Sequence, residues 1–162
     1  IREAVAVFRG VKRRFEYIIK NERIVFIDDY AHHPEELRAL IQGAKTLFRQ
    51  KKCTIIFQPH LYTRTRDLAN GFAEVLDLAD EVVLLPIYPA RELPIEGVNS
   101  EMILDKMKNE NKRIMGRDDL LKWIKFDYVT NINTEFGQVL ITAGAGDIDM
   151  MVEPIKEILE KI

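Results

Sequence analysis

Apolar and polar positions along this chain follow two periods, one typical of buried strands and one typical of amphipathic helices. Five short runs rich in β-favouring apolar residues predict strands. They cover residues 24–28, 53–57, 82–85, 113–115 and 139–142. A further run at residues 15–19 predicts an additional strand at an edge of the sheet.

The segments between these runs carry apolar residues three and four positions apart, which is helical spacing. In "PEELRALIQGAKTLF", Pro34 stands in the first turn and is followed by Glu35 and Glu36, as is common at helix starts. Segments 67–78, 100–108, 117–125 and 148–162 show the same spacing, with Ser100 as an expected N-cap. Strands separated by such helices predict an α/β domain with a mainly parallel sheet of about five or six strands, covered by helices on both faces.

Composition narrows the class of protein. A length of 162 residues with 47% hydrophobic positions fits one domain, and a net charge of −2 gives no electrostatic reason to expect nucleic acid. No apolar run approaches the roughly 18 residues of a membrane span, and no signal peptide is visible. The lone Cys53 excludes an internal disulfide and suggests a buried strand residue in a cytoplasmic protein. The opening "IREAVAVFRG" resembles the tail of a helix, so we expect further protein before it.

Polar residues gather where the predicted strands end. The first strand runs into Asp28-Asp29-Tyr30-Ala31-His32-His33, and the second runs into "QPHLYTRTRD", which contains His60. The third ends in "PIYPARELP" and the last in "TAGAGDI". Because ligands in open α/β sheets bind outside the carboxyl ends of the strands, we expect this edge, with all three histidines, to be the working face.

The acidic and histidine residues of this edge allow several roles. Adjacent residues on a strand point to opposite faces, so Asp28 and Asp29 are expected to separate, one toward a cleft and one bracing a loop. Neighbouring histidines such as His32 and His33 rarely chelate one ion, and their spacing to His60 matches no standard zinc pattern. We therefore favour hydrogen-bonding or substrate contacts over a metal site held by the protein.

Two other features indicate anion recognition. Arg64 and Arg66 in "YTRTRD" carry guanidinium groups suited to a carboxylate or phosphate, and near a helix start they oppose the helix dipole. The turn at Gly144 and Gly146 permits close approach of a backbone or ligand, with Asp147 as a possible N-cap. The chain contains no P-loop and no G-x-G-x-x-G fingerprint after the first strand. These features together look like half of an active site.

At this point the motifs resemble a known family. "FRGVKRRFE", "IDDYAHHPEEL", "FQPHLYTRTRDL", "YPARELPIEGVNS" and "GAGDI" are similar to the carboxy-terminal domain of the Mur ligases, and the resemblance spans nearly all of residues 1–162. It implies a Rossmann-like domain of a three-domain enzyme, with an amino-terminal UDP-sugar domain and a central P-loop domain binding ATP and Mg²⁺. The implied reaction is ATP-dependent joining of L-alanine to UDP-N-acetylmuramate through an acyl phosphate, during synthesis of peptidoglycan precursors.

The resemblance also implies roles for individual residues. Arg14 and Asp29 match nucleotide-binding positions, with Arg13 and Asp28 as adjacent alternatives. The positions that receive L-alanine are matched by Tyr30, His32, His60 and Arg64. Because the ordinary pKa of histidine is about 6.5, our hypothesis is that His32 or His60 accepts the amine proton. Leu61 departs from the family pattern, which often has arginine there, and this removes one possible anion contact.

Three other readings stay open. The chain could be a free-standing module that binds an amino acid or a nucleotide. It could be a metal hydrolase that uses Asp28 or Asp29 with His32 and His60. It could also belong to the related ligase that recycles murein tripeptide, which shares the pattern around the two histidines. Neither the Mur ligase reading nor its tripeptide relative involves nucleic acid or a membrane, and the isolated domain is expected to be inactive alone.

Overall fold

The computed structural model describes residues 11–162, which form a six-stranded sheet with the order β1-β2-β6-β3-β4-β5. The strands are β1 (Glu16–Lys20), β2 (Ile24–Asp29), β3 (Lys52–Phe57), β4 (Glu81–Leu84), β5 (Lys112–Ile114) and β6 (Gln138–Ala143). Neighbouring strands are parallel except for the β1–β2 hairpin at one edge. The expected α/β fold and the edge strand are confirmed. The helix tail expected within residues 1–10 lies outside the described residues.

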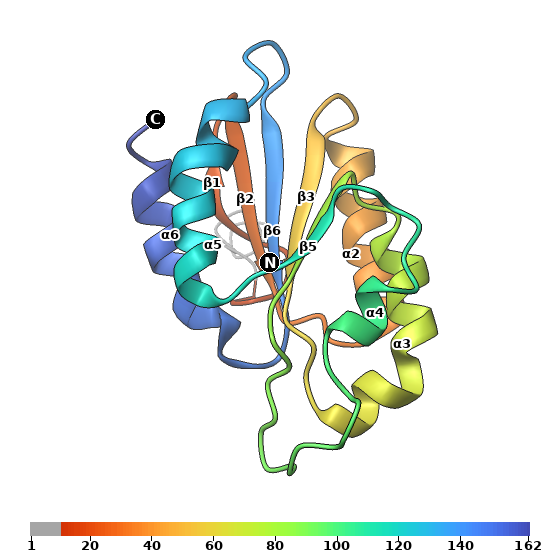
Figure 1. Ribbon diagram of the computed structural model, residues 1–162. Coiled ribbons are helices and arrows are strands. Elements are labelled where there is room, and N and C mark those ends of the chain that lie inside the picture. The colour runs from red at the N-terminus through yellow and green to blue at the C-terminus, as the bar shows by residue number, and fades with distance from the viewer. Residues whose placement is uncertain (1–10) are drawn as a thin grey trace, which may run out of the picture.

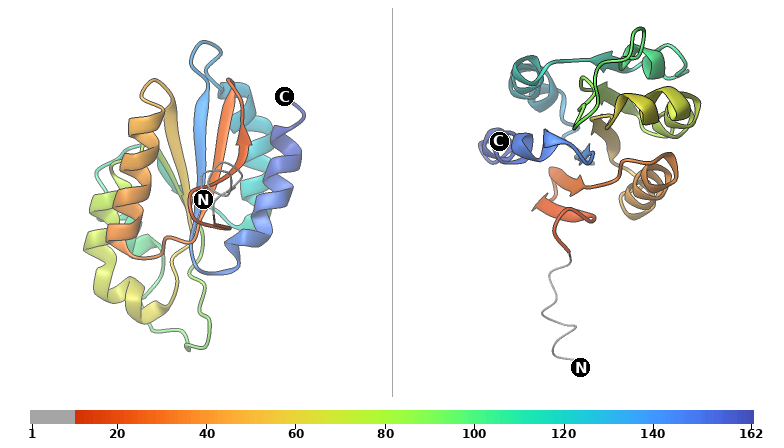
Figure 2. Two further views of the ribbon diagram at one scale, coloured as in Figure 1. Left: turned by 180° about the vertical axis from the view of Figure 1, so that it is seen from behind. Right: turned by 90° about the horizontal axis from the view of Figure 1, so that it is seen from below.

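Helices cover both faces of this sheet (Figures 1 and 2). One face carries α2 (Pro34–Leu47), α3 (Tyr62–Leu76) and α4 (Glu101–Leu104). The other carries α5 (Arg117–Trp123), the π-helical turn η1 (Ile124–Tyr128), and α6 (Val152–Leu159). Short 3₁₀ turns, η2 (Val129–Asn131) and η3 (Asp147–Met151), follow η1 and precede α6. No helix in residues 11–162 has the length and apolar character needed to cross a membrane.

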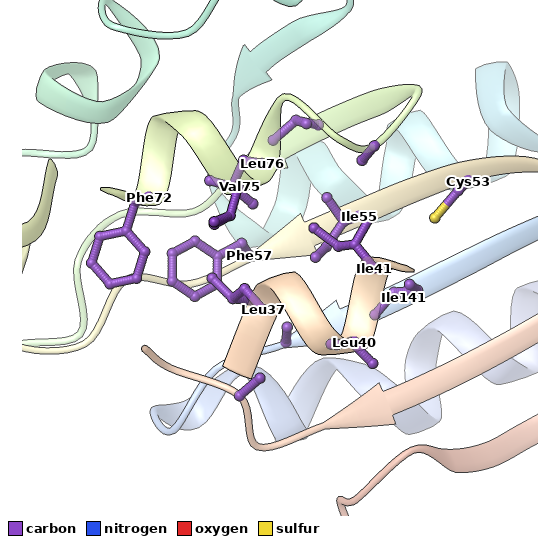
Figure 3. Close-up of a cluster of buried hydrophobic side chains, with 14 of the residues drawn as sticks. Leu37, Leu40, Ile41, Cys53, Ile55, Phe57, Phe72, Val75, Leu76 and Ile141 are labelled. Atoms are coloured by element: carbon purple, nitrogen blue, oxygen red, sulfur yellow. The ribbon is translucent and has the colours of Figure 1, made fainter. Parts of the chain in front are cut away.

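Alternation along the central strands divides the apolar side chains between two cores. On β3, Ile55 and Phe57 face α2 and α3, whereas Ile56 faces α5 and α6. Figure 3 shows the first core, in which Phe57 and Phe72 lie with ring centroids 5.3 Å apart. Because both faces are covered, β2, β3, β4 and β6 are buried almost throughout, which explains their nearly continuous apolar runs.

The observed α3, α4, α5 and α6 all differ in their bounds from the expected segments, since α5 ends before residue 125 and α6 covers only part of 148–162. The differences at α3 and α4 have identifiable causes. Helix α3 begins at Tyr62 rather than at residue 67, because the carbonyl of Leu61 accepts both the backbone N–H and the hydroxyl of Thr65. Because the side chains of this first turn are mostly polar, the turn shows no helical spacing of apolar residues that the sequence could reveal. Helix α4 has four residues, since the Asp77 carboxylate accepts the backbone N–H groups of Lys108 and Asn109 and holds the following chain in a turn.

Candidate functional site at the carboxyl ends of the strands

Four side chains from three segments meet at the carboxyl edge of the sheet, at the bottom of Figure 1. The ring of Tyr30 lies 5.3 Å from that of His32, which lies 6.2 Å from that of His60. The Arg64 Nη1 lies 3.3 Å from the His60 Nδ1. We call these four residues the substrate rim. The parallel topology therefore brings together the loop after β2, the loop after β3 and the first turn of α3, as the sequence predicts.

The loop after β2 holds His32 by both its backbone and its ring. The Glu36 Oε2 accepts the backbone N–H groups of His32 (2.9 Å) and His33 (3.1 Å) at the start of α2. The His32 Nδ1 lies 3.0 Å from the carbonyl oxygen of Tyr30 and 3.4 Å from the Glu36 Oε2. Burial alone would raise the pKa of Glu36, but these amides and the nearby imidazoles lower it. Both neighbours of Nδ1 are acceptors, so in the neutral ring the proton resides on Nδ1 and Nε2 keeps its lone pair.

His60 has the opposite pattern of neighbours. Its Nδ1 faces the guanidinium of Arg64, which can only donate, so in the neutral ring the proton resides on Nε2. The ring of Tyr88 stacks on it at 5.6 Å with an interplanar angle of 20°. Burial lowers the pKa of His60, and the charges of Arg64 and His32 lower it further. His60 is therefore a neutral hydrogen-bonding group at neutral pH.

A pocket of about 370 Å³ lies beside the rim, between β2 and α2. Its lining includes Arg14, Asp29, Tyr30, His32 and Glu36. The carboxylate of Asp29 accepts the backbone N–H groups of Phe15 (2.6 Å) and Ala31 (2.8 Å), which fixes the loop that carries Tyr30. The pocket lining thus includes a guanidinium from Arg14, carboxylates from Asp29 and Glu36, and an imidazole ring from His32.

The neighbouring pair, Arg13 and Asp28, is used inside the fold. The Arg13 Nε donates to the Asp28 Oδ2 at 3.0 Å, and its Nη2 donates to the carbonyl oxygen of Gly144 at 2.7 Å. Asp28 is 2% exposed and also accepts the hydroxyl of Thr142. Burial raises the pKa of Asp28 despite these two partners. The two aspartates do face opposite sides of the sheet, and Arg14 and Asp29 are the members of each pair that line the pocket.

The remaining sequence candidates lie away from the rim or have structural partners. Arg66 is exposed and its Nε donates to the Asp67 Oδ1 at 2.7 Å, so it does not join Arg64. His33 is exposed at the N-cap of α2. Leu61, with φ of 73°, is the N-cap of α3, and its backbone N–H donates to the carbonyl oxygen of Tyr88.

The turn after β6 is packed against protein. A Cβ on Gly146 would lie 2.6 Å from the Tyr88 Cβ and from the Gln58 Oε1, which explains the small residue. The backbone N–H of Ile148 donates to the Gln58 Oε1, so this amide is already occupied. Asp147 is inside the turn rather than its N-cap, and it pairs with Arg117 and accepts the Gln58 amide.

Other sequence candidates concern metal binding and the thiol. In residues 11–162, no group of three or more histidine, cysteine, aspartate or glutamate side chains is arranged to hold a metal ion. Cys53 is buried in β3, as expected, and burial raises the pKa of its thiol to about 12. Neither feature adds a reactive group to the site.

Sequence reasoning missed three residues of the site. Glu36 holds His32, Tyr88 stacks on His60, and Glu92 contacts the first turn of α3 through Thr63. Glu36 carried a usable signal, because a glutamate at the third position of a helix often accepts the N-terminal amides. Tyr88 and Glu92 belong to a loop without periodicity, so their contacts follow from tertiary structure alone.

These features define an α/β domain that gathers arginine, histidine, tyrosine and carboxylate side chains at the carboxyl ends of its parallel strands, the edge at which such sheets bind ligands. The model of the glutamate ligase domain of Mur ligases matches residues 13–146. The chain therefore belongs to the Mur ligase family.

Individual relatives agree with this assignment. The UDP-N-acetylmuramate–L-alanine ligase of Flavobacterium johnsoniae is 48% identical over 161 residues, which is 99% of this chain and 34% of the relative. That of Parabacteroides distasonis is 49% identical over 161 residues, 99% of this chain and 33% of the relative. The crystal structure of the UDP-N-acetylmuramate–alanine ligase of Thermotoga maritima superposes with a TM-score of 0.73 at 33% identity, covering 98% of this chain and 32% of that one. The chain thus spans about a third of the proteins it resembles.

Proposed function

We propose that residues 1–162 are the carboxy-terminal domain of an ATP-dependent ligase that joins L-alanine to UDP-N-acetylmuramate in peptidoglycan precursor synthesis. The support is the similarity of nearly the whole chain to such ligases, together with a rim that brings a guanidinium beside two imidazole rings, groups suited to the carboxylate and amine of an amino acid. In the proposed enzyme, an amino-terminal domain holds the UDP-sugar and a central domain holds ATP and Mg²⁺. The enzyme works in the cytoplasm, and this domain alone is inactive because it lacks both partners.

The proposed reaction forms an amide in two steps. The muramoyl carboxylate oxygen attacks the γ-phosphorus of ATP, giving an acyl phosphate and ADP. The neutral amine of alanine then attacks the acyl carbon, and the tetrahedral intermediate collapses with loss of phosphate and of the amine proton. Mg²⁺ bound with ATP supplies charge neutralisation at the phosphates in the first step. Closure of the domains would exclude water that otherwise hydrolyses the acyl phosphate.

Arg64 is the proposed carboxylate ligand for alanine. Its guanidinium faces the rim and has no carboxylate within 4.0 Å among residues 11–162, so its charge is available for a substrate. The rings of Tyr30, His32 and His60 follow one another beside this guanidinium at contact distance, and Tyr30 and His32 also line the 370 Å³ pocket. A bidentate contact with Arg64 would fix the orientation of the amine relative to these rings.

Either histidine could take up the proton that alanine loses, and the neighbours of the two rings favour His32. Its Nε2 keeps the lone pair because Nδ1 faces two acceptors. His60 faces a donor at Nδ1, so its Nε2–H is a hydrogen-bond donor toward the substrate. We therefore assign His32 as the proton acceptor and His60 as a substrate-binding group.

Arg14 and Asp29 are the proposed nucleotide contacts of this domain. Both line the 370 Å³ pocket, and Arg14 is exposed there. A guanidinium fits the phosphates of ATP, and a carboxylate fits a ribose hydroxyl. The oxygens of Asp29 each accept one backbone N–H and retain a second acceptor site for that purpose.

The deciding experiment is an amide-forming assay of the full-length protein with UDP-N-acetylmuramate, ATP and Mg²⁺. Separate reactions contain alanine, glycine, serine or the murein tripeptide, and phosphate release and the new amide are both measured. We expect alanine to give the highest kcat/KM. Preference for the tripeptide would assign the recycling ligase instead, and absence of any amide product would reject the ligase reading. Stoichiometric zinc that chelator removes together with a hydrolytic activity would favour the metal hydrolase.

A further inference from the structure

Helix α3, which carries Arg64, begins without a capping group of its own. Its N-cap, Leu61, has no side-chain oxygen, and its first turn contains no acidic residue. Arg64 and Arg66 place positive charge near this end, where the helix dipole is already positive. The sequence of the helix therefore leaves its first turn both unsatisfied and electrostatically opposed.

A carboxylate from another loop supplies what the helix lacks. Glu92 lies in the segment between β4 and α4, the green loop at the bottom of Figure 1. Its Oε2 accepts the backbone N–H of Thr63 at 3.0 Å, and its Oε1 accepts the Thr63 hydroxyl. These contacts lower the pKa of Glu92, so it is ionised at neutral pH. An anion at this position both completes the hydrogen bonds and offsets the helix dipole.

The same loop also holds His60. The backbone N–H of Tyr88 donates to the carbonyl oxygen of Pro59, and the backbone N–H of Leu61 donates to the carbonyl oxygen of Tyr88. The Tyr88 ring stacks on the His60 ring. Leu61 is held between these contacts with φ of 73°, a conformation that costs a leucine free energy and needs support from its surroundings. Tyr88 thus fixes His60, and Glu92 fixes the helix turn that follows.

We propose that Glu92 is a positioning residue, which anchors the first turn of α3 so that Arg64 meets the carboxylate of the amino-acid substrate in a preset orientation. Glu92 binds the backbone and hydroxyl of Thr63 and forms no ion pair with Arg64. The guanidinium therefore stays available while its helix is held. The inference rests on the proposed amino-acid site and adds a residue outside the substrate rim to it.

Kinetics of the full-length ligase test this role. Glu92→Ala is expected to raise the KM for alanine about tenfold, the fold-change that corresponds to about 1.4 kcal/mol, which lies within the range that a helix cap contributes to stability. The kcat and the KM for ATP should change less than about twofold, because the contact is lost equally in ground and transition states. Glu92→Gln keeps an acceptor for the Thr63 N–H and a donor for its hydroxyl, so it should stay within about threefold of the wild type. Glu96→Ala, an exposed glutamate of the same loop, is the matched control and should leave every constant unchanged.

Thr63→Val tests the same contact from the other side, and it serves if Glu92→Ala does not fold. The double variant Thr63→Val, Glu92→Ala should have a KM for alanine no higher than Glu92→Ala, because both changes remove one contact. The proposal would be overturned by an unchanged KM for alanine in folded Glu92→Ala. It would also be overturned if this variant lost kcat equally whether alanine or ATP is the varied substrate. The wild-type assay separates this result from the proposed function: if another amine is the substrate, the same variants are compared with that amine.

Discussion

Glu81 and Arg64, which lie at opposite ends of the sheet, differ in the kind of partner that each contacts. At the amino ends of the strands, Glu81 is 6% exposed and accepts both Lys52 Nζ (2.7 Å) and Arg113 Nη2 (2.8 Å). Nearby, Lys45 Nζ pairs with the Asp80 Oδ1 at 2.7 Å. Each of these cations has a carboxylate partner from another segment, so the charges join segments of the fold to one another.

At the carboxyl ends, the polar side chains of the rim face one another, and Tyr30 and His32 also line the pocket. Arg64 contacts the neutral ring of His60 instead of a carboxylate, and His32 leaves its Nε2 free of the acceptors around it. Holding the Arg64 guanidinium beside the half-buried His60 ring, with no carboxylate ion-paired to either among residues 11–162, costs stability. Their arrangement at the edge where α/β sheets bind ligands is best explained by an anionic substrate that completes it. The comparison predicts that substitutions at one end affect binding and those at the other affect folding.

The largest effect is expected for Arg64→Ala in the full-length ligase. Loss of a charge-assisted hydrogen bond costs about 1.5–3 kcal/mol, which corresponds to a rise of roughly 10- to 150-fold in the KM for alanine. The KM for ATP should stay nearly constant, because Arg14 and Asp29 are untouched. Arg66→Ala is the matched control on the same helix, since Arg66 pairs with Asp67 in solvent. Equal alanine KM values for the two variants would remove Arg64 from the pocket.

A smaller effect, on folding stability rather than on substrate binding, is expected for Glu81→Ala. The change leaves two cations without their shared partner beside a buried position, and should lower the free energy of unfolding by about 1–3 kcal/mol. Urea denaturation of the 162-residue chain measures this. Asp119→Ala, which breaks the exposed pair with Lys122, should cost under about 0.5 kcal/mol. In the full-length ligase, Glu81→Ala should leave the KM for alanine unchanged, and a marked rise would contradict the division between the two ends.

The sequence predicts the fold well because its strongest signals are local. The nearly continuous apolar runs of β2, β3 and β6 and the spacing of α2 specify a parallel sheet covered on both faces. Parallel connections then bring the ends of β2 and β3 together, so the meeting of His32, His60 and Arg64 follows from topology. The start of α3 was missed because its first turn is polar and depends on Leu61, whose backbone conformation no periodicity indicates.

The supporting residues of the site could not be predicted in the same way. Glu92 is one of two acidic residues in its loop, and its contact with Thr63 distinguishes it from the other, Glu96. Likewise, the sequence leaves Arg13 and Arg14 equivalent, and the burial of Asp28 separates them by engaging Arg13. These choices depend on packing between segments far apart in the chain. Residue type predicts the chemistry of the site, and tertiary contacts decide which residue of each type takes part.

The smallest expected effect concerns the pKa of His60, and titrating this residue tests the comparison directly. Burial and the charge of Arg64 lower the pKa of His60, so its midpoint should lie below the usual value of about 6.5. A lowered pKa means that the folded state releases this proton more readily than the unfolded state, and folding therefore loses stability as the pH falls from about 6.5 through the folded midpoint. In Arg64→Ala the midpoint should move upward, and in Arg66→Ala it should not move. NMR of the histidine Cε1–H signals resolves this, since the chain contains three histidines. A wild-type midpoint at or above 6.5 would mean that the guanidinium is neutralised after all, and that the two ends of the sheet do not differ in the way described.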